Sequence, residues 1–472
     1  MNVLLVQPHQ GDNVKKGIFH PGVEVPLNII YLAAYLDKEN IHNDILDMRI
    51  SPDPYGWLDK ALSESKPDIV GISACTSEFD NAREVARRVK AHNSECLVIL
   101  GGHHASALAK ESLRDVSEID LVVHGEGELT LTEIVRRHEA GQELIGLAGT
   151  AYRDGSEIVI MPRRPLIESL DSLPFPARDK LNIDDYAPNP GTGNYMQLPT
   201  SGIMASRGCP YRCNYCSKCV WDTTIRFRSP ENVVSEIESC VERFGIKDFR
   251  FYDDALTLPK WDIQKFCQML IDKDLGVTWN CYSRVNHITE EKLRLMKAAG
   301  CYHIKYGVEF GTEKALKLAN KGATLDMARN AVRLTKKVGI ECKSNFVMGI
   351  PGENIDDCKQ TIAFAKELSP DLASFYPFYL IPGSQFYNRT RDNDPELGEK
   401  LPFEVTRKLS NRAYLSFYFR PSYIIQRLAR LTRNPRRELS VLINGVSMIT
   451  CYFVKLFLQK IKVADRPEPV RD

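Results

Sequence analysis

The sequence predicts an α/β protein in which a doubly wound parallel-sheet domain is followed by a partial barrel of six βα units and a helical C-terminal region. Three observations lead to this class. Apolar runs alternate with amphipathic segments along most of the 472 residues, which is the pattern of βαβ units. Hydrophobic residues make up 43% and charged residues 26%, which is typical of globular chains. The length suits about three structural units.

Residues 1–145 are expected to form the first domain. Three of its strands lead directly into turn residues: Gln7-Pro8, Gly101-Gly102 and Gly125-Glu126-Gly127. Ligands of open α/β sheets bind at the carboxyl ends of the strands, so we expect this doubly wound, flavodoxin-like domain to hold a ligand there. The expected strands are Asn2–Gln7, Asn43–Asp47, Asp68–Ser73, Leu97–Leu100 and Asp120–Val123, and the expected helices are Leu27–Lys38, Phe79–Ala91 and Thr130–Glu139.

Residues 146–198 are expected to be a linker that packs on the surface. A hairpin is predicted around Asp154-Gly155, and a proline-rich stretch follows at 173–176, with Pro188, Pro190 and Gly191 further on. Proline and glycine interrupt regular structure, so this composition favours an irregular connection.

Residues 199–400 are expected to form a partial (βα)6 barrel, two units short of a closed eightfold barrel. Its first helix begins with Ser229 as N-cap and Pro230 at the first helical position. The expected strands are Gly202–Ser206, Asp248–Tyr252, Thr278–Tyr282, His303–Val308, Lys343–Met348 and Leu372–Phe378. The helices are Pro230–Phe244, Lys260–Asp272, Glu290–Ala299, Glu313–Leu318, Leu325–Val338 and Asp356–Leu368.

Three cysteines follow the first barrel strand. Cys209, Cys213 and Cys216 have the spacing C-x3-C-x2-C, on a loop at the barrel face where active sites lie. Three nearby thiolates suit an iron–sulfur cluster with one open iron. Zinc is the alternative, with Cys219 as a fourth ligand or else a spare thiol. The count of 13 Cys is odd and the N-terminus resembles no export signal, so we expect a cytoplasmic protein without a disulfide framework.

With Tyr215 at its aromatic position, the C-x3-C-x-aromatic-C motif resembles the signature of the radical SAM superfamily. The resemblance implies that Cys209, Cys213 and Cys216 hold a [4Fe-4S] cluster and that the open iron binds S-adenosyl-L-methionine (SAM), with Tyr215 near the adenine. An external electron donor such as flavodoxin or ferredoxin would reduce the cluster, and SAM would then be cleaved to methionine and a 5′-deoxyadenosyl radical.

By the same resemblance, residues at the ends of the later barrel strands contact SAM. A single carboxylate on a loop is more often solvated, but the shared position at strand ends favours a binding role. The expected residues are Asp253 or Asp254 for the amino group of SAM, Arg284 for its carboxylate, Glu309 for the ribose, and Gly349 and Gly352 beside the adenine.

The first domain resembles the cobalamin-binding domain that precedes the barrel in one radical SAM subgroup. Matching segments are 26–36, 69–73, 101–104 and 124–128. Small residues at strand ends let a flat macrocycle approach the backbone. The cobalamin contacts implied are Ser73, Thr76, Gly101, Gly102, His104, Gly125, Glu126 and Gly127, with Ser77 a further candidate.

One departure from cobalamin proteins concerns the histidine that ligates cobalt. The usual Asp-x-His-x-x-Gly motif is not matched at residues 8–12, so the lower axial face is expected to be open or approached by a nearby side chain. His9, His103 and His104 are candidates for that side chain, although loop histidines more often serve as hydrogen-bonding groups. A domain that binds no cobalamin also remains an alternative.

The charge of the chain is divided unevenly. Residues 401–472 hold 14 Lys and Arg against 5 Asp and Glu, so their net charge is +9, and the rest of the chain has a net charge of −8. We expect no nucleic-acid partner for this acidic body. For residues 407–462, two alternatives stay open: a helical cap over the barrel mouth with its arginines solvated or paired to the body, or a peripheral contact with an anionic membrane. A transmembrane helix at 441–458 is disfavoured.

The sequence therefore predicts a cobalamin-dependent radical SAM enzyme that methylates an unactivated carbon of a small molecule, with lipids and polycyclic compounds as candidates. The first alternative is a radical SAM oxidoreductase or cyclase without methyl transfer, resembling the anaerobic magnesium-protoporphyrin cyclase. The second, of a different class, is a non-catalytic cobalamin or redox sensor that retains a cluster.

Overall fold

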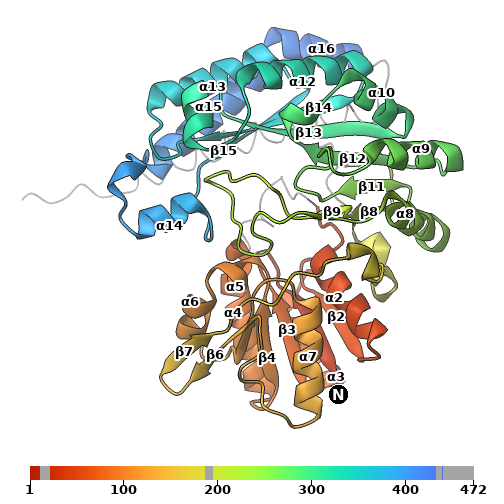
Figure 1. The fold of residues 1–472 in the computed structure, drawn as a ribbon, viewed down its shortest axis with the longest axis vertical. Coiled ribbons are helices and arrows are strands. Elements are labelled where there is room, and N and C mark those ends of the chain that lie inside the picture. The colour runs from red at the N-terminus through yellow and green to blue at the C-terminus, as the bar shows by residue number, and fades with distance from the viewer. Residues whose placement is uncertain (11–21, 187–194, 432–437, 439–472) are drawn as a thin grey trace, which may run out of the picture.

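The computed structural model describes residues 1–10, 22–186, 195–431 and 438. Figure 1 shows an N-terminal sheet domain below, a second sheet domain above, and the C-terminal helices on the side of the second domain that is remote from the first. The yellow-green segment that follows the linker lies between the two domains.

The N-terminal sheet has the strand order β2-β1-β3-β4-β5-β6-β7. Its first five strands are parallel and adopt the flavodoxin-like order, which confirms the predicted fold class. The strands are β1 (Val3–Gln7), β2 (Asn43–Asp47), β3 (Ile69–Ser73), β4 (Leu97–Gly101) and β5 (Leu121–Val123). The helices are α2 (Leu27–Lys38), α3 (Pro54–Ser65), α4 (Phe79–His92), α5 (His103–Ala107), α6 (Ala109–Asp115) and α7 (Glu128–Glu139), with the 3-10 turn η1 (Thr76–Glu78).

The hairpin expected around Asp154-Gly155 is present, but it extends the N-terminal sheet. Strands β6 (Thr150–Asp154) and β7 (Glu157–Ile160) pair antiparallel with each other, and β6 pairs with β5. Ala151 is fully buried in this sheet, so residues up to Ile160 pack with the first domain rather than with the linker expected from residue 146. The connection that follows contains the 3-10 turns η2 (Leu170–Ser172), η3 (Arg178–Lys180) and η4 (Ile183–Asp185).

The second domain is the predicted partial (βα)6 barrel. Its six parallel strands are neighbours in chain order, and β8 and β15 form the two edges. The strands are β8 (Thr200–Ile203), β11 (Asp248–Phe251), β12 (Thr278–Ser283), β13 (Cys301–Glu309), β14 (Glu341–Met348) and β15 (Leu372–Pro377). The helices are α8 (Pro230–Phe244), α9 (Ile263–Lys273), α10 (Glu290–Ala298), α11 (Glu313–Leu318), α12 (Leu325–Val338) and α13 (Ile355–Leu368). Shorter elements are β9 (Ser206–Arg207), β10 (Arg226–Phe227), η6 (Val285–His287), α14 (Gln385–Arg391) and η7 (Pro395–Leu397).

Helix α15 (Phe403–Tyr418) covers the open edge of the barrel at β15. The Tyr418 hydroxyl donates to the carbonyl of Ala373 at 2.7 Å and accepts from its N–H at 3.0 Å. A seventh strand would otherwise pair with these backbone groups, so the helix protects an edge that could bind another chain. Phe417 is fully buried against Phe375 of the same strand.

Helix α16 (Pro421–Leu431) lies at the amino ends of β14 and β15. Arg427 donates to Glu438 at 3.1 Å and to Glu341 at 3.5 Å, and Arg430 pairs with Asp371. These arginines are thus paired to the acidic body, as one alternative expected, but at the end of the barrel opposite its mouth. Residues 439–472, which include the apolar stretch 441–458, and Arg433, Arg436 and Arg437 lie outside the described residues. Within the described part, no helix is both long and apolar enough to cross a membrane.

Candidate cofactor sites at the domain interface

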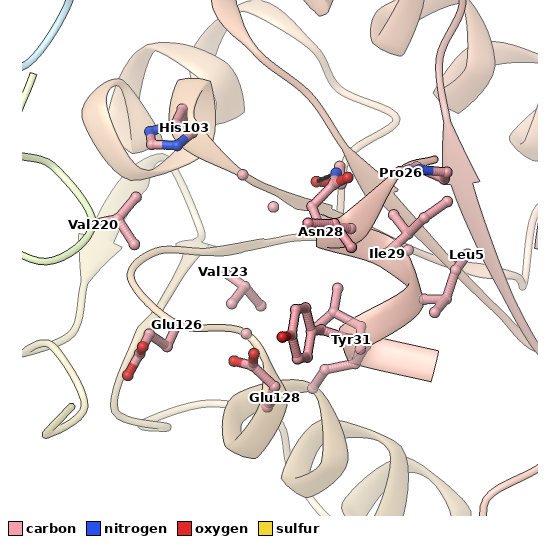
Figure 2. Close-up of a pocket in the computed structure, with 18 of the residues that line it drawn as sticks. Leu5, Pro26, Asn28, Ile29, Tyr31, His103, Val123, Glu126, Glu128 and Val220 are labelled. Atoms are coloured by element: carbon pink, nitrogen blue, oxygen red, sulfur yellow. Dashed lines mark hydrogen bonds between the residues drawn. The ribbon is translucent and has the colours of Figure 1, made fainter. Parts of the chain in front are cut away.

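A cavity of about 460 Å³ lies at the carboxyl edge of the N-terminal sheet, against the second domain. Figure 2 shows its apolar floor, which includes Leu5 and Val123, and the ring of Tyr31 from α2. Val220 and Trp221 from the cysteine loop form part of the opposite wall. The cavity therefore belongs to both domains.

Glycines at the ends of β4 and β5 and within β3 leave parts of the sheet side of this cavity free of side chains. A Cβ on Gly101 would meet its nearest neighbour only at 3.9 Å, and a Cβ on Gly125 would meet nothing within 4 Å. Gly71, Gly102 and Gly127 also line the cavity. An apolar floor with bare backbone at its rim fits a large flat macrocycle, so the residues present fit cobalamin.

Filling this space tests the assignment. Gly101 has no unusual backbone angle, so Gly101→Leu should fold and project its side chain into the cavity. We expect cobalamin retained per chain, read from its absorbance after gel filtration, to fall at least about tenfold, because a leucine and a macrocycle overlap sterically. Ala140→Leu, on the exposed end of α7, is the matched control and should retain cobalamin. Full retention by the Gly101 variant would contradict the assignment.

Only some of the polar residues predicted to bind cobalamin line the cavity. Ser73 lines the cavity and accepts a hydrogen bond from Asn28 at 2.9 Å. Thr76 and His104 lie outside the cavity lining: the His104 ring stacks on Phe79 at 3.8 Å, and its Nδ1 contacts Thr76 Oγ1 at 3.3 Å. Of the three histidines considered as ligands, only His103 is among the residues that line the cavity.

Glu126, which is predicted to contact cobalamin, lines the cavity, and its carboxylate also joins the two domains. It accepts hydrogen bonds from Arg207 and Arg226 at 2.9 Å and from Trp221 Nε1 at 3.2 Å. Burial raises its pKa, but the Arg226 hydrogen bond and the Arg207 charge hold the net value below the ordinary one. Neighbouring Glu128 accepts a further bond from Arg207 at 2.6 Å. Arginines on the two strands that flank the cysteine loop thus form ion pairs with the carboxylates at the rim of the cavity.

The cysteine loop connects β9 to β10 at the mouth of the barrel. The thiols of Cys213 and Cys216 interact, and Arg284 Nη1 lies 3.7 Å from Cys213 Sγ. The hydrogen bond with Cys216 lowers the pKa of Cys213, burial raises it, and the charges of Lys321 and Arg284 lower it further. The net effect is a pKa below the ordinary value of a thiol. As the side chains stand, the described residues contain no group of three His, Cys, Asp or Glu arranged to hold a metal ion. Three thiols on one loop beside two cations nevertheless form a donor set that fits an anionic iron–sulfur cluster.

The contacts of Cys219 are with Ser217 and the first domain. Its sulfur lies 3.2 Å from Ser217 Oγ and 3.5 Å from the carbonyl of His103 in the first domain. The side chain is buried at the domain interface. The position supports the spare thiol rather than the fourth ligand.

Lys321 joins two of the residues predicted to contact SAM. Its ammonium group donates to the Tyr215 hydroxyl at 3.0 Å and pairs with Glu309 Oε1 at 3.2 Å. Glu309 has φ +70°, and the strand register shifts between Gly307 and Glu309. Such strained backbone at a non-glycine residue is typical of functional sites. Sequence reasoning missed Lys321, which lies after α11 in a loop without a recognisable motif.

The two aspartates after β11 have different surroundings. Asp253 is buried, accepts from the N–H of Ala205 at 3.1 Å and from the Ser206 hydroxyl, and burial raises its pKa to about 6. It therefore ties β11 to the segment between β8 and β9. Asp254 is exposed and makes no hydrogen bond within the described part of the chain, so it is the better placed of the two for a ligand.

The glycines after β14 shape a loop that packs on α15. Gly349 and Gly352 have φ +88° and +86°, and a Cβ on Gly349 would collide with Thr406. Glu353 accepts from the N–H groups of Gly349 and Ile350 at 2.8 and 2.9 Å. The loop conformation is thus held within the protein, and a contact of these glycines with adenine stays a prediction.

Glu353 gives a pH-dependent test of this loop. Burial raises the pKa of its carboxyl to about 7, above the ordinary 4.5. The folded state therefore binds the proton more tightly, and the free energy of unfolding should fall as pH rises from about 4.5 to about 7, by up to about 3 kcal/mol. Glu353→Gln cannot ionise, so its unfolding free energy in urea should lack this decrease. Identical pH slopes for the variant and the parent would refute the expectation.

Comparisons with known proteins agree with this arrangement. Residues 203–365 match the family model of the radical SAM superfamily, and residues 20–135 match that of the B12 binding domain. The protein named "Uncharacterized methyltransferase PH0819" of Pyrococcus horikoshii is 32% identical over 442 residues, which cover 90% of this chain and 94% of the relative. The anaerobic magnesium-protoporphyrin IX monomethyl ester cyclase of Rubrivivax gelatinosus is 29% identical over 416 residues, covering 85% of this chain and 71% of the cyclase.

A solved structure with the same fold is that of the cobalamin-dependent SAM radical enzyme OxsB with aqua-cobalamin and SAM bound. Its TM-score is 0.72 at 18% sequence identity, and the alignment covers 93% of this chain and 72% of the OxsB chain. At this identity the likeness establishes the fold alone.

Proposed function

The chain belongs to the radical SAM superfamily and carries a B12-binding domain, and from this premise we propose that it transfers a methyl group to an unactivated carbon of a small molecule. Its cofactors are a [4Fe-4S] cluster, SAM and cobalamin. When bound, the cluster and SAM supply a radical that abstracts hydrogen, and cobalamin supplies a transferable methyl group. The protein holds these groups close together and excludes water.

One observation carries this proposal. The loop with Cys209, Cys213 and Cys216 continues directly to Val220 and Trp221, which line the cavity of the first domain. The same loop is fixed to that domain by Arg207 and Arg226 on Glu126. A substrate between the two cofactors would therefore meet both of them, as methyl transfer after hydrogen abstraction requires.

The chain's own residues position SAM in this proposal. Cys209, Cys213 and Cys216 would hold the cluster, and the Arg284 guanidinium beside Cys213 is placed to pair with a carboxylate. Glu309, held by Lys321, is placed to accept hydrogen bonds from ribose hydroxyls. Arg284 also stacks on the ring of Tyr211 at 3.5 Å, which fixes its orientation.

The experiment uses SAM with a trideuterated methyl group. The reconstituted protein is incubated anaerobically with this SAM, cobalamin, reduced flavodoxin as electron donor and a small-molecule extract. We expect a product that carries three deuterium atoms, detected by mass spectrometry. Absence of any deuterated product while 5′-deoxyadenosine forms would refute methyl transfer.

A cyclase or oxidoreductase function is the second candidate, because the Rubrivivax gelatinosus relative is a cyclase. Such an enzyme would form 5′-deoxyadenosine and a substrate product without added deuterium. A lipid or polycyclic substrate was suggested by the basic and apolar C-terminal region. Within the described residues, Arg427 and Arg430 of that region are paired to the barrel instead, so this feature no longer supports a lipid.

A further inference from the structure

The lumen of the partial barrel contains cationic side chains that the cofactor sites do not use. Along β14 the side chains alternate between half-buried and buried, and Lys343, Asn345 and Val347 belong to the half-buried set. Successive side chains of a strand point to opposite faces, and α12 and α13 pack on this strand from outside. The half-buried set therefore faces the lumen, where these side chains remain partly exposed.

Neighbouring strands place further cations beside Lys343. In the strand register, Lys343 lies next to Lys305 of β13, and Lys305 lies next to Tyr282 of β12. The Lys305 ammonium donates to Asn280 Oδ1 at 3.0 Å and lies 5.1 Å from the centroid of the Tyr282 ring. The Arg250 guanidinium of β11 lies 5.4 Å from the same ring. Arg250 and Lys305 thus lie at the Tyr282 ring, and Lys343 stands beside Lys305 on the next strand.

Of these three cations, Arg250 is the one that forms an ion pair within the described residues, although the charge of Glu24 also acts on Lys305. Arg250 pairs with Glu24. Neither lysine has a carboxylate within ion-pair distance in the described part of the chain, and the Lys343 ammonium group makes no hydrogen bond there although the side chain is half-buried. Burial and the charge of Arg250 lower the pKa of Lys343 to about 8, and they also lower the pKa of Lys305, which is only 2% exposed. A partly desolvated excess of positive charge favours an anionic ligand.

We propose that Lys343 and Lys305 bind an anionic group, a phosphate, phosphonate or carboxylate, on the small-molecule substrate. This inference rests on the proposed function, because it assumes a substrate that reaches the cofactors. The cofactors would lie at the carboxyl ends of the strands, toward which the lumen opens. Lys305 precedes Glu309 on β13 by four residues, a rise of about 13 Å. A substrate anchored at the lysines therefore extends from the lower lumen toward the cofactors. The carboxylate of SAM is the other source of such an anion, and the test below distinguishes the two.

The test measures binding of methylphosphonate to the reconstituted full-length protein by calorimetry, with its uncharged dimethyl ester as the matched ligand. We expect methylphosphonate to bind and the ester not to bind. Lys343→Met should weaken methylphosphonate binding at least about tenfold, because a charge-assisted hydrogen bond is lost. Lys343→Arg should stay within about threefold of the parent. Lys359→Met, an exposed lysine on α13 paired with Asp356, is the control and should leave binding unchanged.

Several results would overturn the inference. These are no methylphosphonate binding by the parent protein, equal binding by the Lys343→Met variant, or a tenfold loss of SAM affinity in that variant, which would assign the lysines to SAM. Lys343→Gln replaces the Met variant if the latter does not fold. S-adenosylhomocysteine formation from SAM and cobalamin is measured on the same preparations. Its presence without methylphosphonate binding refutes only this inference, and its absence with binding intact refutes only methyl transfer.

Discussion

Cys213→Ala should abolish 5′-deoxyadenosine formation, by at least about a thousandfold. The loop supplies three thiols to the cluster, and removing one leaves two ligands, which cannot hold it with an open iron for SAM. The Cys213 thiol also contacts Arg284, so its loss disturbs the residue expected to bind the SAM carboxylate. The measurement is 5′-deoxyadenosine by liquid chromatography after dithionite reduction, together with iron content and the absorbance of the cluster.

Cys219→Ala is the matched control for this change. Cys219 lies three residues beyond Cys216 in the same loop, but its sulfur contacts Ser217 and His103 instead of the other thiols. The variant should therefore keep its iron content and its 5′-deoxyadenosine formation. Equal losses in the two variants would contradict the assignment of three ligands and favour a four-cysteine metal site. Persistent 5′-deoxyadenosine formation by the Cys213 variant would show that the cysteine motif is not required for SAM cleavage.

Glu236→Gln should lower the free energy of unfolding by about 3–5 kcal/mol, the usual cost of breaking a buried ion pair. The Glu236 carboxylate is fully buried and accepts from Arg178 at 2.7 Å and from Arg228. Arg178 comes from the linker and also donates to the carbonyl of Gly202 in β8. The change leaves two buried guanidinium groups without a carboxylate at the point where the linker meets the barrel.

The control is Glu238→Gln, two residues further along the same helix. Its carboxylate pairs with Lys273 on the surface, and exposed pairs contribute at most about 1 kcal/mol. Urea unfolding followed by circular dichroism gives both values. A loss below about 1 kcal/mol for the Glu236 variant would show that this triad does not stabilise the join between the linker and the barrel.

The fold was predictable because its signals are local in the sequence. Alternating apolar runs gave the five parallel strands of the first domain and the six of the barrel, and Ser229 and Pro230 marked the start of α8. Helix α3 was missed, since among its residues only Leu58 and Leu62 are buried and its amphipathic pattern is weak. The strands β6 and β7 were assigned to the linker because a hairpin pattern does not indicate which sheet it joins.

The cofactor sites were predictable only in part. The cysteine spacing is a local motif, and the strand ends give positions for Arg284 and Glu309. The ion pair between Glu126 and Arg207 could not be predicted, since the two residues are 81 positions apart in the sequence. The same holds for Lys321, whose contact with Tyr215 spans 106 residues. Side-chain pairing between residues far apart in the sequence depends on tertiary structure, and periodicity carries no information about it.

We expect this single chain to combine radical formation with a methyl-carrying cobalamin. The most direct measurement is the mass analysis of SAM products after anaerobic reconstitution, with and without cobalamin. We expect 5′-deoxyadenosine together with S-adenosylhomocysteine, and the latter only when cobalamin is present. Formation of 5′-deoxyadenosine with no S-adenosylhomocysteine, in protein shown by its absorbance to have bound cobalamin, would contradict the account.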